Sequence, residues 1–351
     1  MRDKLLESVA NTIKTYREGE LDAPTPEHVD RWLKQFSFAN QLPFLREFDH
    51  VLKQTFILKE AIFQFLSHVI GNADLTNGDP KSYWKKTNLL QIQKYGQSQK
   101  EMLKLFDVSL AQQCKISLVE CGGIDGDYIY FDDVIFNGMR AGDDLEAWVR
   151  TDAPVKGRLY VIVIAYHTFG QFKLERRLSS VCQEVGKKIQ ILYKCAGWQI
   201  ENRKSQKSSS GVLWPKAIPE TQDVKEFMEL STNYPFEPRQ FYGSIINPFS
   251  SEEGRHILEQ EFLIGGAKIR AGCENPSTSI RPLGFSPFGV GFGSLIITYR
   301  NCPNTCPLAI WWGDLEAGSP ALEWYPLLSR EGYSSAKNIF NDIADLTLDG
   351  T

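Results

Sequence analysis

A run of branched apolar residues restricts the fold of this chain more than any other feature. It reads LYVIVIA over residues 159–165 and lacks the alternation of apolar and polar residues that marks a strand with one solvated face. Such a run is typical of a strand buried on both faces, and strands of this kind occur in parallel sheets covered by helices. The sequence therefore predicts a parallel sheet within an α/β domain.

Segments on both sides of this run support the same fold class. Short apolar segments, each expected to form a strand, alternate with longer segments expected to form helices. The expected strands are residues 88–92, 128–131 and 188–193, and the expected helices are residues 98–107, 142–150 and 172–185. Strands that alternate with helices indicate an α/β fold, here a parallel sheet flanked by helices.

The residue composition and pattern of the chain change outside this region. Apolar residues recur at helical spacing near the N-terminus, and Thr25-Pro26-Glu27 has the form of a helix start with Thr25 as N-cap. Beyond a polar, Ser-rich stretch, Gly, Pro and aromatic residues become frequent. We expect a helical N-terminal cap (1–72), an α/β core (73–199), an exposed linker or loop (200–212) and a C-terminal hood or lid of loops and short strands (213–351).

Composition excludes several classes of protein. Hydrophobic residues make up 42% and charged residues 23% of the 351 residues, which is ordinary for a globular protein. The net charge of −4 does not indicate direct nucleic-acid binding. No apolar run approaches the roughly 18 residues that span a bilayer, so no membrane association is expected. The seven scattered cysteines and the charged N-terminus favour a cytoplasmic location.

Two adjacent carboxylates follow the strand expected at residues 128–131. Asp132 and Asp133 would lie at the carboxyl end of that strand, where open α/β sheets bind ligands. Neighbouring residues of a regular strand point to opposite faces, but at a strand end that enters a turn both acids can face one ligand. The pair could accept hydrogen bonds from a ribose diol, hold a hydrated Mg²⁺, or simply cap the strand.

The residues after the acid pair suit an anion. Asn137, Gly138 and Met139 would present backbone N–H groups at a helix N-terminus, and phosphate is a natural occupant of such a site. Arg140 adds a forked cation that matches phosphate oxygens. Diol-binding acids beside a phosphate loop together describe a site for a 5-phosphoribosyl group. A metal-dependent phosphotransfer site is the alternative, although no third ligand or nucleophile is evident.

The stretch YIYFDDVIFNG, residues 128–138, resembles the phosphoribosyl-pyrophosphate motif of type I phosphoribosyltransferases. The wider chain resembles the PRTase-CE domains of bacterial conflict systems, including proteins encoded beside some retron reverse transcriptases. This second resemblance is carried by RWLKQF, LPFLREFDHVLKQT, LLQIQKYGQSQKEML, YIYFDDVIFNG, GFGSLI and TYRNCPNTCPLAIWWG. It implies a phosphoribosyltransferase-like fold and an effector role in anti-phage defence.

The chain departs from the type I motif after the acids. The family usually has small hydroxyl residues at the positions of Phe136, Asn137 and Arg140. It often has a second Gly at the position of Met139. Contacts of side chains with the 5-phosphate would therefore differ from those of the family.

The resemblance also implies a pyrophosphate loop between an earlier strand and the next helix. Lys94, Tyr95, Gly96, Gln97 and Ser98 occupy the corresponding place. Gly96 would allow close approach of the backbone, Ser98 would be the helix N-cap, and Lys94 would supply charge. An ordinary loop with a serine cap is the alternative.

Four further residues are candidates for contact with a base or with the leaving group. His167 follows the buried run 159–165 and would lie at the ligand-facing edge of the sheet, unless it is a packed loop histidine. Asn301, Asn304 and Trp311 have the features of a hood over a base, because amides can read a base edge and aromatic rings can stack on it. The alternative is that the tryptophan is core and the Asn residues shape turns.

Three hypotheses follow for the function. The first is an enzyme that binds Mg²⁺–phosphoribosyl pyrophosphate and acts at ribose C1, with Asp132 and Asp133 on the ribose diol. The second is a non-catalytic sensor of a nucleotide or phosphoribosyl ligand, whose N-terminal helices dock a partner such as a reverse transcriptase or a winged-helix protein. The third is a purely structural subunit, which would bind no ligand.

Overall fold

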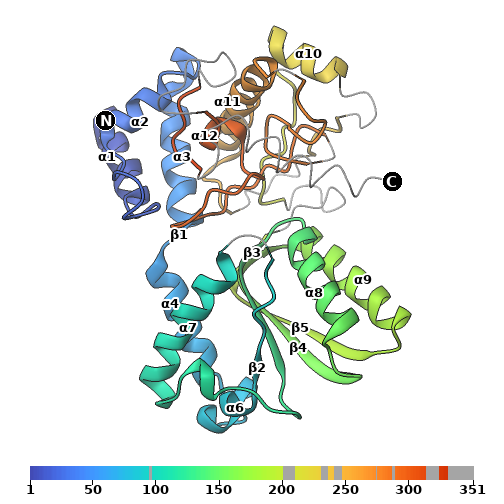
Figure 1. Cartoon of the computed structure of the whole chain (residues 1–351). Helices are drawn as coiled ribbons and strands as arrows, with labels where there is room; N and C mark the ends of the chain where they lie inside the picture. Colours follow the sequence, from blue (N-terminus) through green and yellow to red (C-terminus); the bar gives the residue numbers. More distant parts are fainter. Residues whose placement is uncertain are drawn as a thin grey trace. The chain divides into compact units, whose positions relative to one another are not determined.

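The computed structural model (Figure 1) describes eight stretches of the chain. These are residues 1–94, 97–200, 210–230, 236–240, 247–273, 275–286, 289–313 and 324–330. The chain divides into two compact units. We call Leu58–Arg203 the α/β unit, and Met1–Ile57 with Lys204–Thr351 the discontinuous unit, and we describe each by itself.

The α/β unit is built on a four-stranded parallel sheet. Its strands follow the chain in the order β2-β3-β4-β5, and every neighbouring pair is parallel. The strands are β2 (Asn88–Leu89), β3 (Tyr128–Ile135), β4 (Lys156–His167) and β5 (Lys188–Ile200). The helices are α4 (Lys59–Gly71), α5 (Ala73–Thr76), α6 (Pro80–Lys86), α7 (Ser98–Cys114), η2 (Leu118–Glu120), α8 (Met139–Thr151) and α9 (Thr168–Glu184). The predicted α/β fold with a helix-flanked parallel sheet is confirmed.

The apolar run at residues 159–165 lies within β4. From Leu159 to His167 every residue of this strand is buried, because β3 and β5 pair with its two edges and helices cover the sheet. The observed β3, β4, β5, α7, α8 and α9 are longer than predicted, whereas β2 ends at Leu89 rather than at residue 92. Strand pairing extends a strand past its apolar residues, and local pattern alone does not contain that information.

Different helices cover the two faces of the sheet (Figure 1). Tyr130 of β3 packs in a core with residues of α8 and α9, such as Leu145 and Leu174. The next residue, Phe131, points to the other face, where its ring lies 4.8 Å from that of Phe106 on α7. The chain therefore leaves β2 for one face and β3 for the other. In open α/β sheets, a ligand crevice forms at the carboxyl ends of strands where this divergence occurs.

The discontinuous unit joins the two ends of the chain in one core. Its elements are α1 (Arg2–Ile13), α2 (Pro26–Leu33), η1 (Phe38–Asn40), α3 (Gln41–Thr55), β1 (Phe56–Ile57), α10 (Gln222–Leu230), α11 (Glu252–Ala271), β6 (Ile297–Thr298) and α12 (Leu308–Trp311). Thr25 caps α2 by accepting the N–H of His28, as the sequence predicts. β1 and β6 form a parallel pair.

Aromatic side chains hold this core together. Trp32 of α2 is fully buried against Phe44 and Phe48 of α3 and against Phe262 of α11. Its indole N–H donates a hydrogen bond to the carbonyl of Ala309, 277 residues away in sequence. The α1–α3 helices are thus packed with the C-terminal part of the chain.

The chain divides at positions other than those expected from its sequence. α4 lies within the expected N-terminal cap (1–72) but belongs to the α/β unit. In the expected exposed linker, residues 200–212, Ile200 ends β5 and both Ser210 and Val212 are buried, while residues 201–209 lie outside the described part. Among the described helices, none is long and apolar enough to cross a membrane.

The core of the discontinuous unit predicts a contrast between two phenylalanines. Phe262 is fully buried and Phe38 is 91% exposed. We expect Phe262→Ala to lower the free energy of unfolding by roughly 3–5 kcal/mol, because it removes a ring from a packed core. Phe38→Ala should change it by less than about 0.5 kcal/mol. Urea unfolding of both variants tests this, and equal losses would contradict the packing described.

Candidate functional site

The acid pair lies inside β3 rather than after it. The sequence predicts a strand that ends at residue 131, but β3 continues to Ile135, so both acids are strand residues. Asp132 is only 5% exposed, and its Oδ1 accepts the N–H of Asp133 at 2.8 Å. Asp133 is half-buried, and its Oδ1 accepts the N–H of Val134 at 2.8 Å. Each carboxylate thus satisfies the backbone donor that follows it.

The regular alternation of facing side chains breaks at the pair. Tyr130 and Ile135 are five residues apart, yet they pack in the same core. The register with β4 pairs Asp132 with Val163 and continues at Val134, without a pair for Asp133. In the neighbouring β4–β5 pair a register shift falls at the same level, between Val163 and Ala165, and an irregularity of this kind re-aims side chains next to it. Neighbouring residues of this stretch therefore need not point to opposite faces of the sheet.

Burial gives Asp132 an unusual protonation equilibrium. Loss of solvent and the negative charge of Asp133 together raise the pKa of Asp132 to about 7, although a hydrogen bond from Ser98 acts in the opposite direction. Near neutral pH this carboxyl is therefore divided between its two forms, which is a common property of functional acids. It can donate as well as accept a hydrogen bond at the pH of a cell.

The segment before α7 lies beside the acid pair. Gln93 Nε2 donates to the Ser98 hydroxyl at 2.7 Å, and this hydroxyl lowers the pKa of Asp132. The Gln99 side chain holds the same segment by accepting the N–H groups of Ile92 and Gln93. Two candidate regions that lie far apart in the sequence are therefore adjacent in the fold.

The details of the predicted pyrophosphate loop need one correction. Ser98 is the first residue of α7 and Gln97 is the N-cap, but the capping contact comes from Gln93, whose Oε1 accepts the N–H of Gln99 at 3.0 Å. The Ser98 hydroxyl accepts a hydrogen bond from Gln93 Nε2 and lowers the pKa of Asp132. Lys94 is exposed, and Tyr95 and Gly96 lie outside the described residues.

Asp144 is a site residue that the sequence analysis missed. It is 3% exposed, its Oδ1 accepts the N–H of Lys94 at 3.2 Å, and its Oδ2 lies 3.5 Å from the Tyr130 hydroxyl. The same hydroxyl is 3.5 Å from Asp132 Oδ2. Burial raises the pKa of Asp144, while the Lys94 N–H and the charge of Arg140 lower it. An acid on the apolar face of α8, between Ala141 and Leu145, was the signal in the sequence.

The predicted phosphate loop leads into α8. Gly138 is the N-cap in the left-handed region, with φ of 77°, and Met139 and Arg140 are the first helical residues. Asn137 Oδ1 accepts the N–H of Met139 at 3.0 Å. Arg140 is exposed, and its charge acts on both Asp144 and Tyr130. Within the described residues, no hydrogen bond is made by the N–H of Arg140 or of Ala141, which leaves both donors to an anion.

Two glycines bring this loop against the start of α9. A Cβ atom on Gly138 would lie 2.4 Å from the carbonyl oxygen of Gly170, and a Cβ on Gly170 would lie 2.0 Å from that of Phe136. Neither residue can carry a side chain without displacing backbone. The position of the predicted phosphate loop therefore depends on direct backbone contact with α9.

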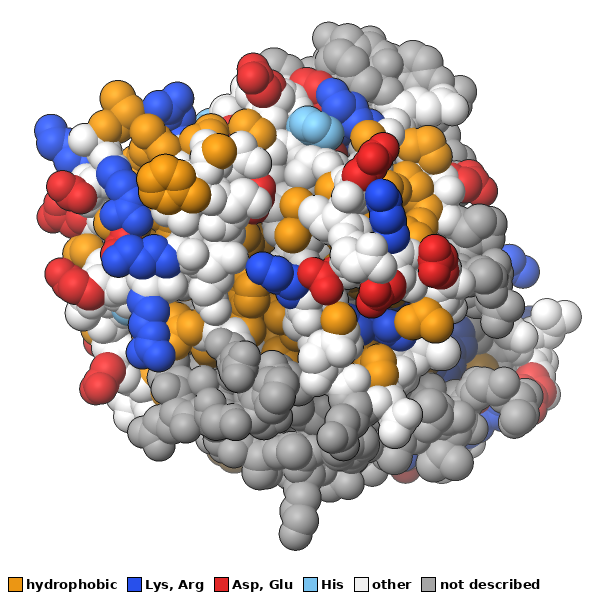
Figure 2. Space-filling model, turned by 90° about the horizontal axis from the view of Figure 1, so that it is seen from above, with side chains coloured by type: hydrophobic (Ala, Val, Ile, Leu, Met, Phe, Trp, Pro, Cys, Tyr) orange, Lys and Arg blue, Asp and Glu red, His pale blue; other side chains and the backbone are white. Residues whose placement is uncertain are grey.

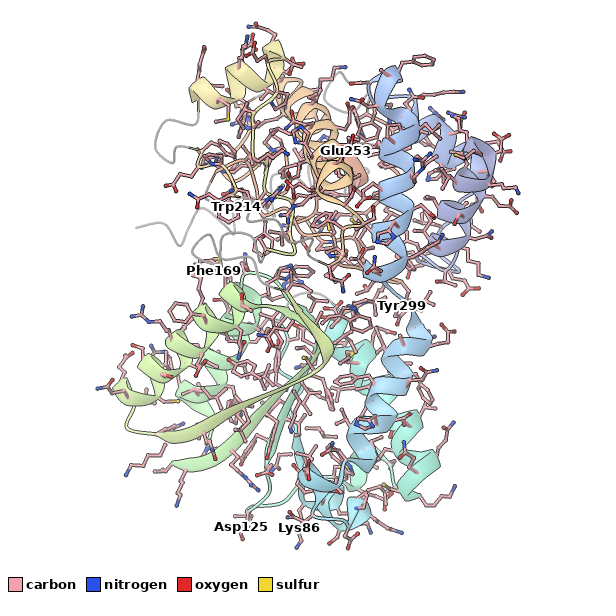
Figure 3. The ribbon with its side chains drawn as sticks, turned by 180° about the vertical axis from the view of Figure 1, so that it is seen from behind. Lys86, Asp125, Phe169, Trp214, Glu253 and Tyr299 are labelled. Carbon is pink, nitrogen blue, oxygen red and sulfur yellow. The ribbon has the colours of Figure 1, made fainter. Side chains whose placement is uncertain are left out.

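His167 is a packed residue in this structure. It ends β4, is fully buried, and its ring centroid lies 5.3 Å from that of Phe136. Burial lowers its pKa to about 3, so the imidazole is neutral at physiological pH. It supports the predicted phosphate loop through Phe136. Figure 3 shows Phe169, two residues further on, at the end of the α/β unit opposite Asp125 and Lys86.

The candidate hood residues belong to the discontinuous unit. Trp311 is fully buried and donates its indole N–H to the carbonyl of Cys306 at 2.9 Å, so the structure places it in the core. Asn301 bonds to Thr298 through backbone groups, and the Asn304 carbonyl accepts the N–H of Phe285. These contacts are those of turn and core residues.

The donor set at the acid pair suits a Mg²⁺ ion that arrives with a diphosphate. Mg²⁺ prefers oxygen ligands and commonly uses one or two carboxylates together with phosphate oxygens of the substrate. Asp132 and Asp133 are carboxylates of this kind. In the part of the chain that the structure describes, no group of three His, Cys, Asp or Glu side chains forms a metal site.

The pKa of Asp132 predicts a pH-dependent stability. Its pKa is higher in the folded than in the unfolded chain, so the folded state gains from the proton below pH 4 and loses this gain as the pH rises through about 7. Asp132→Asn should therefore raise the free energy of unfolding at pH 8 by roughly 2–4 kcal/mol, and by progressively less toward pH 4.

Glu184→Gln is the control for this experiment. A hydrogen bond from Arg150 lowers the pKa of Glu184, so its contribution is present above the usual pKa and lost as the pH falls. The control should lose a little stability at pH 8 and none at low pH. Urea unfolding across pH 4–8 measures both, and parallel curves for Asp132→Asn and wild type would contradict the assignment.

The glycine contact predicts a second effect on stability. Gly170→Ala should lower the free energy of unfolding by about 1–3 kcal/mol, because the new methyl group overlaps the Phe136 carbonyl. Gly71→Ala is the matched control, since it also lies in a helix of this unit and its nearest neighbour, Gln113 Oε1, is 3.6 Å away. The control should be neutral or stabilising by up to about 1 kcal/mol. Thermal unfolding distinguishes the two.

Comparison with known proteins places the chain in a family. No curated protein and no solved structure matches it significantly. The family model described as PRTase-CE matches residues 29–330, which is most of the chain and includes both candidate loops, the acid pair and Asp144. The α/β fold with its parallel sheet agrees with this match. The chain therefore belongs to the PRTase-CE family and is a phosphoribosyltransferase-like protein.

Proposed function

We propose that this protein binds Mg²⁺–phosphoribosyl pyrophosphate, or a nucleotide that carries the same phosphoribosyl group, and acts at ribose C1. One set of contacts carries the proposal. Asp144 Oδ1 accepts the Lys94 N–H at 3.2 Å, and the Tyr130 hydroxyl lies 3.5 Å from an oxygen of Asp144 and 3.5 Å from one of Asp132. These contacts bring the segment assigned to pyrophosphate next to the acids assigned to ribose. Membership of the PRTase-CE family supports the same ligand class.

Each part of the site has a role in the proposed reaction. Asp132 and Asp133 accept hydrogen bonds from the ribose 2′ and 3′ hydroxyls. The N–H groups of Arg140 and Ala141, with the Arg140 guanidinium, bind the 5-phosphate. The predicted pyrophosphate loop, of which Lys94, Gln97 and Ser98 lie in the described part, binds the pyrophosphate. When bound with the substrate, Mg²⁺ neutralises charge on the leaving pyrophosphate.

The proposed reaction is a displacement at one carbon. The bond from C1 to the pyrophosphate oxygen breaks, and pyrophosphate leaves with the electron pair, while a bond forms between C1 and a base nitrogen or a water oxygen, which releases its proton to solvent. The transition state resembles an oxocarbenium ion. The protein contributes chiefly by positioning the reactants and by placing negative carboxylates near the developing positive charge.

The biological role is proposed from the family. We propose that the protein is an effector of anti-phage defence that depletes or modifies a nucleotide pool. Its α1–α3 helices would contact a protein partner, such as a reverse transcriptase or a winged-helix protein. Figure 2 shows Lys and Arg side chains interspersed with Asp and Glu on one face of the protein, which favours a protein or small-molecule partner over direct nucleic-acid binding on that face.

A non-catalytic sensor is the second candidate function. The observation that favours it is the hydrogen bond from the Met139 N–H to Asn137 Oδ1, which uses one donor of the expected phosphate cradle inside the protein. A sensor would use the same pocket to hold its ligand without turnover. The two candidates differ only in whether pyrophosphate is released.

Calorimetric titration of Mg²⁺–phosphoribosyl pyrophosphate tests the proposed binding. Asp132→Asn/Asp133→Asn should weaken binding by about 10–100-fold, because hydrogen bonds to charged groups contribute roughly 1.5–3 kcal/mol. The charge-matched control is Asp125→Asn/Asp152→Asn, which removes two exposed acids outside the site. This control should bind as wild type does. Absence of binding by wild type would overturn the proposal that phosphoribosyl pyrophosphate is the ligand.

Assay of the same samples for pyrophosphate separates enzyme from sensor. Release by wild type and by the control, but not by the Asp132→Asn/Asp133→Asn variant, supports the enzyme. Binding without release supports the sensor. Phage plating on cells that carry either form tests the defence role, which predicts more plaques with the site variant.

A further inference from the structure

The two neighbouring acids of α8, Asp143 and Asp144, have opposite environments. Asp143 pairs with Arg177 of α9 at 2.6 Å, and its side chain is 52% exposed. Asp144 points inward, is 3% exposed, and contacts a backbone amide from the segment between β2 and α7. A buried carboxylate is costly unless its contacts compensate, so its presence on an otherwise apolar face calls for a role.

Asp144 is linked to both ends of the proposed ligand. On one side its Oδ1 accepts the Lys94 N–H, at the beginning of the segment assigned to pyrophosphate. On the other side the charge of Arg140, which belongs to the phosphate loop one helical turn earlier, lowers the pKa of Asp144. Tyr130 connects it to Asp132, since the hydroxyl lies 3.5 Å from an oxygen of each acid.

We propose that Asp144 is a positioning residue that fixes the Lys94 backbone relative to the N-terminus of α8, and so sets the separation of the two anion-binding segments. The inference deepens the proposed function and rests on its assignment of those segments to pyrophosphate and to the 5-phosphate. Asp144 touches neither anion. It acts through Lys94 and through Arg140.

This role has a consequence for each end of the ligand. Without the carboxylate, the Lys94 backbone loses its anchor, and binding of pyrophosphate must bear the cost of ordering it. The charge of Arg140, by contrast, is no longer partly neutralised, so the 5-phosphate end should bind equally well or more tightly. A residue with only a structural role would weaken both ends together.

Two variants of Asp144 separate its hydrogen bond from its charge. Asp144→Ala removes both. Asp144→Asn keeps an oxygen that can accept the Lys94 N–H, so it should restore the anchor. Asp143→Asn is the matched control, because it removes the same charge from the adjacent, outward-facing position, where Arg177 retains Glu146 as a partner.

Hydrogen exchange tests the anchor without any ligand. Exchange of the peptide that contains Gln93 and Lys94 should be at least tenfold faster at the Lys94 amide in Asp144→Ala than in wild type. Asp144→Asn and Asp143→Asn should exchange within about threefold of wild type. Equal protection in Asp144→Ala and Asp143→Asn would overturn the inference, whatever the protein binds.

Titration with inorganic pyrophosphate and with ribose 5-phosphate, each in the presence of Mg²⁺, tests the effect on the two ends. Asp144→Ala should weaken pyrophosphate binding by at least tenfold and leave ribose 5-phosphate binding unchanged or tighter, while Asp144→Asn should stay within about threefold for pyrophosphate. Equal weakening of both ligands would overturn the positioning role. If wild type binds neither ligand, the proposed function fails, and hydrogen exchange alone then decides whether Asp144 anchors Lys94.

Discussion

Burial of one carboxyl group, that of Asp132, organises the end of the sheet around it. A carboxyl that loses water must find hydrogen-bond donors in the protein, and Asp132 finds them in the N–H of Asp133 and in the Tyr130 hydroxyl. The Ser98 hydroxyl of α7, which accepts a hydrogen bond from Gln93 Nε2, lowers the pKa of the same carboxyl. The start of α7 and the neighbouring strand therefore meet at this single acid. Stability is given up at this point in exchange for a defined arrangement, as at many functional sites.

The second acid, Asp144, extends this network to α8. The tyrosine hydroxyl between Asp132 and Asp144 has one proton and two carboxyl neighbours, so the protonation of one acid affects the other. The close contact of Gly138 with Gly170 adds a constraint that involves no polar side chain. Hydrogen bonds on one side and backbone packing on the other thus hold the first turn of α8 in place.

Much of the α/β unit could be predicted from the sequence, because each strand and helix carries its own period of apolar residues. The end of β3 could not, since Asp-Asp usually signals a turn, whereas here the carboxylates replace ladder partners and the strand continues. Asp144 could have been found, because an acid at an apolar helix position is visible in the pattern of α8. The contact of Trp32 with Ala309 could not be predicted from the sequence, because no residue near α2 specifies a partner 277 residues away.

The interrupted course of the discontinuous unit has a consequence for folding during synthesis. Residues 58–203 form one continuous stretch, so all partners of the α/β unit are available once that stretch has left the ribosome. The helices α1–α3 emerge earlier, but Phe262 and Ala309, which cover Trp32, are made last. Domains of a nascent chain fold as their residues become available, so we expect the α/β unit to fold before the discontinuous unit. Until the chain is complete, the apolar faces of the N-terminal helices are exposed, and these are the surfaces that a chaperone would recognise.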